Sequence, residues 1–187
     1  MVDMTKTRTE AMTLLKEWVK NENLIKHMLY VEAAVRAYAR KFGEDEELWG
    51  ITGLLHDFDY EKYPTKEGHP AEGNKILKEQ GYPEEMLTAI MGHADYSGVS
   101  RESKLAKTLY ACDELSGFIV AVARVRPEKL AGMKAKSVNK KLKNKQFAAA
   151  VSREDIDRGV EEMEVDKNEH IDFVIKAIQG IAPELGL

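Results

Sequence analysis

Apolar residues recur at intervals of three and four along almost the whole chain, and this spacing is its strongest constraint on the fold. The clearest example is the segment 24–42, where the recurring residues are Leu24, Met28, Val31, Val35, Tyr38 and Phe42. On a helix of 3.6 residues per turn these side chains form one stripe. No run of alternating apolar and polar residues is long enough to indicate a sheet. The sequence therefore predicts an all-α fold, a helical bundle.

Glycines, prolines and capping residues divide this pattern into helices. Gly43 suits the end of the first one, and Asp45 suits the start of the next. The expected helices cover residues 24–42, 45–58, 70–81, 83–92 and 105–127. Shorter helices are expected from Ser137 onward: the pair Ser152 and Asp155 resembles a cap, and Asn168 is expected to cap a last helix closed by Gly180.

The composition limits the classes of protein to consider. With 187 residues, of which 43% are hydrophobic, the chain can enclose one continuous core, so a single domain spanning 1–187 is expected. There is no apolar run of roughly 18 residues and the N-terminus is polar, which favours a cytoplasmic protein without a membrane partner. A net charge of −4 argues against a surface dedicated to nucleic acid, and the oligomeric state stays open.

Histidines and aspartates stand at or near the ends and inner faces of several expected helices. His27 borders the apolar stripe of 24–42, and the adjacent pair His56 and Asp57 ends the apolar run ITGLL. The others are His69, His93 and Asp113. One inward histidine alone is more often a satisfied core residue. Drawn together from several helices, however, imidazole nitrogens and carboxylate oxygens form a suitable cage for a first-row cation.

The order of these residues resembles the HD superfamily of metal-dependent phosphohydrolases, an all-α family. The similarity covers roughly residues 24–126 and includes HMLYVEAAVRAYA, ITGLLHDFDY, GHPAEGNKIL and AIMGHADY. The C-terminal extension, 127–187, is similar to that of a bacterial and archaeal branch of predicted HD hydrolases. Phe58, Asp59 and Tyr60 follow the pair where other branches carry lysine or glycine, so the substrates of those branches do not carry over.

The resemblance implies a ligand set. It assigns His27, His56, Asp57 and Asp113 to one metal ion, and it matches His69 and His93 to the extra histidines of members that hold two ions bridged by Asp57. One divalent transition metal is expected, with room for a second. Manganese, iron, cobalt, nickel and zinc all remain candidates, because the donor types do not separate them.

Two carboxylates and a basic segment are the candidates for the remaining catalytic and binding roles. Asp59 and Glu61 follow the ligand pair closely and are expected to move a proton or orient a water; the alternative is that both are solvated loop carboxylates. The candidates for binding an anionic substrate are Arg124, Arg126, Lys140 and Lys141. The lysines could equally form a solvated helix face. Cys112 and His170 are expected to be structural, or exposed in the case of His170.

Three functions remain open from the sequence. The leading hypothesis is a metal-dependent phosphohydrolase that acts on a small phosphorylated molecule, such as a nucleotide, through a metal-activated water. The same histidine and aspartate series resembles the di-iron oxygenases of the superfamily, of which myo-inositol oxygenase is one. The third hypothesis is a module without catalytic activity that binds a metal or a nucleotide.

Overall fold

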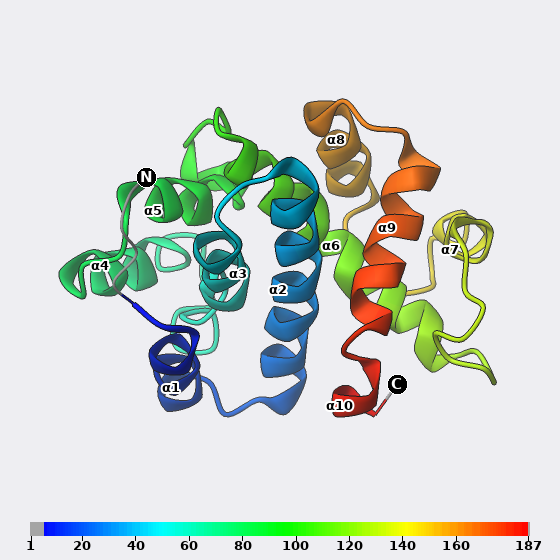
Figure 1. Cartoon of the computed structure of the whole chain (residues 1–187), viewed down its shortest axis with the longest axis horizontal. Helices are drawn as coiled ribbons and strands as arrows, with labels where there is room; N and C mark the ends of the chain where they lie inside the picture. The colour runs from blue at the N-terminus through cyan, green and yellow to red at the C-terminus, as the bar shows by residue number, and fades with distance from the viewer. Residues whose placement is uncertain (1–5, 187) are drawn as a thin grey trace.

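The all-α prediction is confirmed by the computed structural model, which describes residues 6–186 (Figure 1). Within this range there are ten α-helices, one short 3-10 helix and no strand. The elements are α1 (Arg8–Trp18), α2 (Glu22–Phe42), α3 (Glu46–Leu55), α4 (Ala71–Glu79), α5 (Glu84–Gly92), η1 (Asp95–Ser97), α6 (Lys104–Arg124), α7 (Ala135–Leu142), α8 (Arg153–Met163), α9 (Lys167–Gln179) and α10 (Ala182–Leu185).

Local capping chemistry sets most of the helix ends. Gly43 closes α2 in the left-handed conformation, with a φ of 71° that favours glycine. The Asp45 carboxylate accepts hydrogen bonds from the first N–H groups of α3, and Ser152 caps α8 through the N–H of Asp155. The prediction that Asn168 caps this helix was wrong. Asp166 caps α9 instead, because its carboxylate accepts hydrogen bonds from Asn168 N and Glu169 N.

Helices α2 and α6 organise the core. In Figure 1, α2 stands in the middle with α3 and α9 on its two sides, and α6 passes behind it; all three neighbours contact α2. Met28 and Tyr38 of α2 and Phe118 of α6 are fully buried. Each of the two helices has 21 residues; α2 packs against α3, and α6 packs against α5.

The close approach of α3 to α2 depends on a glycine. A Cβ atom at Gly53 would lie 3.0 Å from the Cα of Glu32 in α2, a tight contact that would push the two helices apart by a few tenths of an ångström. With no side chain there, the last turn of α3 can pack directly against α2. Helix α3 ends at Leu55, slightly earlier than predicted, so His56 and Asp57 follow its last turn beside α2. None of the helices in 6–186 combines the length and apolar character that a membrane crossing requires.

Candidate metal centre

The histidines and aspartates singled out from the sequence converge into two groups. His27, His56 and Asp113 form the first group, and Asp57, His69 and His93 form the second. In each group one ligand atom from every residue lies within 4.8 Å of the other two. The six residues come from α2, α6 and the segments at the ends of α3, α4 and α5. The fold thus gathers side chains that are up to 86 positions apart in the sequence.

In the first group, two imidazoles face one carboxylate oxygen. Asp113 Oδ1 lies 2.9 Å from His27 Nε2 and 3.4 Å from His56 Nε2. Ligand atoms about 2.0–2.2 Å from one tetrahedral or octahedral ion are themselves roughly 2.8–3.6 Å apart. Both separations fall in that interval, so the three donors could share one ion.

The second group has the same spacing. Asp57 Oδ1 lies 3.2 Å from His69 Nε2 and 3.2 Å from His93 Nε2, and the two nitrogens are 3.2 Å from each other. The other carboxylate oxygen, Asp57 Oδ2, lies 3.6 Å from His56 Nε2 in the first group. Asp57 is therefore the one residue whose two oxygens face different groups, as a carboxylate between two ions would.

Hydrogen bonds on the far side of the rings fix the orientation of three imidazoles. His56 Nδ1 donates to Gly53 O at 2.8 Å, and His93 Nδ1 donates to Ile90 O. Each acceptor is a carbonyl three residues earlier in the last turn of a helix, and Ile90 O also accepts from His93 N. With the proton on Nδ1, the lone pair of Nε2 points into the cluster, which is the arrangement of a metal-ligating histidine. A helix end thus explains why His56 and Asp57 are adjacent in sequence.

The third orienting partner is Asp59. Its Oδ1 accepts a hydrogen bond from His69 Nδ1 at 2.7 Å, and its Oδ2 accepts from Gly73 N at 2.8 Å. A Cβ at Gly73 would lie 2.6 Å from the carboxylate carbon of Asp59, so only glycine allows this contact. Asp59 is 1% exposed. A carboxylate behind a ligating histidine holds the ring and increases its basicity.

The cluster carries a strong internal electrostatic field. Burial would lower the pKa of His56, but the carboxylates of Asp57 and Asp113 raise it to about 9. Burial would also lower the pKa of His69, but Asp57 and Asp59 raise it to about 9. In turn, burial favours the neutral acids, yet the neighbouring imidazoles hold the pKa values of Asp57 and Asp113 well below the usual range.

One buried nitrogen atom has the surroundings of a metal ligand. His56 is 0% exposed, and its Nε2 has no hydrogen-bond partner in the described chain. Buried imidazole nitrogens are normally paired, so this atom fits a ligand to a metal ion. Four imidazoles and two carboxylates form a donor set that suits manganese, iron, cobalt, nickel or zinc.

A cavity of about 450 Å³ leads to the cluster. Ligand residues of both groups line it, and its other walls carry Tyr60, Ala94, Asp95, Tyr96, Tyr110, Glu114, Gly117, Ala150, Val151 and Asp155. Burial, followed by the charge of Asp113, raises the pKa of Glu114 to about 7. Sequence reasoning missed these wall residues; Glu114 follows Asp113 directly and Tyr96 follows GHAD, but neither position has a spacing that indicates a wall.

The two predicted catalytic carboxylates do not line this cavity. Asp59 is buried behind His69, and both of its oxygens accept hydrogen bonds, so it is placed to orient His69, while its part in proton transfer stays a prediction. Glu61 is exposed, and its Oε2 accepts hydrogen bonds from Lys20 N and Asn21 N, each at 2.9 Å. Glu61 therefore holds the segment between α1 and α2.

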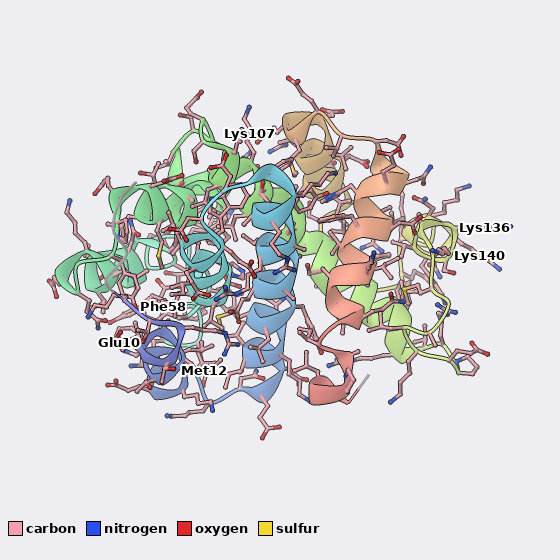
Figure 2. All side chains as sticks on the ribbon, in the orientation of Figure 1. Glu10, Met12, Phe58, Lys107, Lys136 and Lys140 are labelled. Carbon is pink, nitrogen blue, oxygen red and sulfur yellow. The ribbon has the colours of Figure 1, made fainter. Side chains whose placement is uncertain are left out.

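The predicted substrate-binding cations also lie elsewhere. None of Arg124, Arg126, Lys140 and Lys141 is part of the cavity wall. Arg124 donates to Asn23, and Arg126 donates to Ala131 O. Lys140 is exposed on the outer side of α7, as Figure 2 shows, and Lys141 packs on the ring of Phe147. These four side chains are therefore outside the wall of this cavity, and their role in binding an anionic substrate stays a prediction.

Comparison with known proteins agrees with this arrangement. A family model described as HD domain matches residues 24–117, slightly more than half of the chain. The matched range contains all six residues of the two groups, from His27 to Asp113. No curated protein and no solved structure matches the chain. Helices α7 to α10 lie outside the matched range.

Proposed function

Because this chain belongs to the HD-domain family, we propose that it is a metal-dependent phosphohydrolase that acts on a small phosphorylated molecule, such as a nucleotide. The observation that carries the proposal is Asp57. Its two oxygens face the His69 and His93 pair on one side and His56 on the other. This supports two divalent cations in adjacent positions, one for each group of ligands.

A divalent cation held by these residues would polarise a phosphoryl oxygen and lower the pKa of a water to about 7. The chain's own residues prepare the site for that chemistry. Gly53, Ile90 and Asp59 hold three imidazoles with Nε2 inward, so little reorganisation is needed on metal binding. In the hydrolysis the water oxygen bonds to phosphorus, the bond from phosphorus to the leaving oxygen breaks, and a proton from the water ends on that leaving oxygen.

The cavity supports an enzymatic role over a purely structural one. Structural metal sites are closed by protein ligands, whereas catalytic sites keep a position open. Here His27, Asp57 and Asp113 all border a hollow that is large enough for a small metabolite. The side-chain exposure of Asp57 and Asp113 is 17% in each case, so solvent reaches both carboxylates.

Metal analysis combined with a substrate screen tests the proposal. Protein purified without chelator should contain close to two equivalents of transition metal, and it should release phosphate from some member of a panel of phosphomonoesters, nucleotides and phosphodiesters. His56→Ala should lower both the metal content and the activity. His170→Gln, a matched change of a buried histidine outside the cluster, should preserve the metal. An unchanged metal content in His56→Ala, together with no hydrolysis by the metal-replete protein, would refute the proposal.

The second candidate is a di-iron oxygenase. Four imidazoles and two carboxylates divided between adjacent groups also suit two iron ions. Two equivalents of iron and oxygen consumption without phosphate release would favour it. A redox-inert metal with phosphate release would exclude it.

A further inference from the structure

One wall of the cavity comes from beyond the part of the chain that matches the family. Ala150, Val151 and Asp155 line the cavity, and they belong to the start of α8 and the segment that precedes it. In Figure 1 this segment connects α7 with α8, on the side of α6 away from α4 and α5. The HD-domain match ends at residue 117. The candidate ligands therefore lie within the matched range, while this wall lies outside it.

Two charged side chains hold the wall in place. The guanidinium group of Arg153 donates to four backbone carbonyls of the segment 144–151. From the opposite side, Glu114 Oε2 of α6 accepts a hydrogen bond from Ser152 N at 3.1 Å. The wall is thus tied to the helix that carries Asp113, so its side chains keep a fixed position relative to the metal ligands.

The charge of the cavity is unusual for a site that receives phosphate. No lysine or arginine is among the residues that line it, and three carboxylates besides the ligands do: Asp95, Glu114 and Asp155. Asp95 is neutralised, because it pairs with Arg101 and Arg158. Among the described residues, neither Glu114 nor Asp155 forms an ion pair with a lysine or arginine. The outer cavity thus carries the carboxyl groups of Glu114 and Asp155, neither of them in a direct ion pair.

The charges of the inner and outer cavity favour different parts of a substrate. Two divalent cations with the carboxylates of Asp57 and Asp113 leave a net formal charge that matches one phosphate group. A second phosphate would extend toward Glu114 and Asp155, where it would meet the negative charge of Asp155 and a Glu114 side chain that supplies no positive charge, and no lysine or arginine lines the cavity to balance it. Hydroxyl and amine groups, in contrast, can donate hydrogen bonds to these carboxylates. Tyr60 and Tyr96, each 45% exposed, offer aromatic surface at the mouth.

We propose that the substrate carries a single phosphoryl group on a hydrogen-bond-donating moiety without negative charge, and that Glu114 and Asp155 exclude substrates with a second phosphate. This inference rests on the proposed phosphohydrolase function. It names the substrate class of the same site: the monophosphate of a nucleoside, a sugar or a similar hydroxylated compound, and not a di- or triphosphate.

Matched pairs that differ only in the second phosphate test this selectivity. The metal-loaded protein is assayed with AMP against ADP and with fructose 6-phosphate against fructose 1,6-bisphosphate. We expect kcat/KM to be at least about tenfold higher for the monophosphate in any pair that is turned over. Calorimetry with AMP and ADP gives a second readout and should show the same order of affinities. An equal or higher kcat/KM for ADP or fructose 1,6-bisphosphate, or tighter binding of ADP than of AMP, would overturn the inference.

Variants identify the residues responsible. Asp155→Asn keeps the backbone N–H that Ser152 caps, and Glu114→Gln keeps an oxygen that can accept from Ser152 N, so both variants are expected to fold. Each should reduce the preference for monophosphate about three- to tenfold. Asp157→Asn on the same helix does not line this cavity and should leave the preference unchanged. An unchanged preference in both test variants would overturn the assignment of these residues.

If the proposed phosphohydrolase function is wrong, the assays give a different result from a failure of the selectivity alone. If no compound, including p-nitrophenyl phosphate, releases phosphate, the phosphohydrolase proposal is refuted. Calorimetry then still decides the selectivity: tighter binding of AMP than of ADP, with that difference reduced in Asp155→Asn, would support it, and the reverse order would refute it.

Discussion

Buried histidines occur in two regions of this molecule, and their nitrogen atoms have different partners. In the metal cluster, His56 and His69 face carboxylates that raise their pKa values to about 9. In the core between α6 and α9, His170 accepts a hydrogen bond from Tyr38 at 2.6 Å and donates to Ala111 O at 3.0 Å. Burial lowers the pKa of His170 to about 4.

The comparison shows that burial alone does not identify a ligand. His56 and His170 are 0% and 1% exposed, so accessibility does not separate them. Their partners do: both nitrogens of His170 are paired with neutral groups, whereas His56 Nε2 is unpaired and faces two acids. Burying a polar atom without a partner costs free energy, so His56 Nε2 fits a ligand atom, whereas the paired nitrogens of His170 do not. Helix α6 takes part in both regions, through Asp113 and through Ala111.

The largest effect is expected from Asp57→Ala. This change removes the only carboxylate that faces both groups, so both ions should be lost or strongly weakened. We expect kcat/KM to fall at least about 10³-fold, which corresponds to about 4 kcal/mol of transition-state stabilisation. Elemental analysis and a phosphate-release assay measure the two quantities. Asp157→Ala is the control on an exposed carboxylate. Retention of two ions and full activity would show that Asp57 does not bridge the groups.

His170 should make the stability depend on pH with a defined sign. Its pKa in the folded protein, about 4, is below the model-peptide value of 6.5, so the unfolded chain binds the proton more readily. Its stabilising contribution is complete above pH 6.5 and is lost as the pH falls toward 4, by up to about 3 kcal/mol for a shift of this size. Denaturant unfolding of wild type and His170→Gln should show a free-energy difference that shrinks across this window. Parallel curves would mean that His170 is not held neutral.

Asp59→Asn tests whether Asp59 is a positioning residue. Asparagine offers one oxygen where Asp59 uses two, so either His69 or Gly73 loses its acceptor. Loss of such a partner typically lowers metal affinity about 10–100-fold. The loss should be confined to the ion at His69 and His93, as measured by chelator competition. Unchanged affinity with a lost limb in the pH–rate profile would instead identify Asp59 as the proton donor.

The sequence predicted what depends on local chemistry. The stripe in 24–42, the caps at Gly43 and Asp45, and the placement of His56 at a helix end follow from spacing along one element. His27, three residues after Leu24, was therefore correctly placed toward the interior. These features depend on neighbours within about one helical turn, and a single sequence contains that information.

The rest depends on how helices rotate and pack against one another. Asp59 is two positions after Asp57, yet one carboxylate faces the cluster and the other faces the ring of His69 from behind. The lysines of α7 form a basic run in sequence, but none of them lines the cavity. Asp155 lies in the cavity wall, more than 40 positions from any ligand. Spacing along one helix does not specify which element its far neighbours will meet.

The smallest effect is expected from Glu61→Gln. Glu61 is exposed and accepts from Lys20 N and Asn21 N, immediately before α2, which carries His27. Glutamine keeps one acceptor oxygen but removes the negative charge near the positive end of α2, which typically costs about 0.3–1 kcal/mol. We therefore expect a small fall in the free energy of unfolding, measured by denaturant titration, with metal content and kcat/KM unchanged. A phosphate-release assay on the same variant separates a role in stability from a role in catalysis. A tenfold loss of kcat at unchanged metal content would show that Glu61 takes part in the reaction. A loss of stability alone would mean that the turn after the ligand pair contributes to folding, while the chemistry stays with the residues around Asp57.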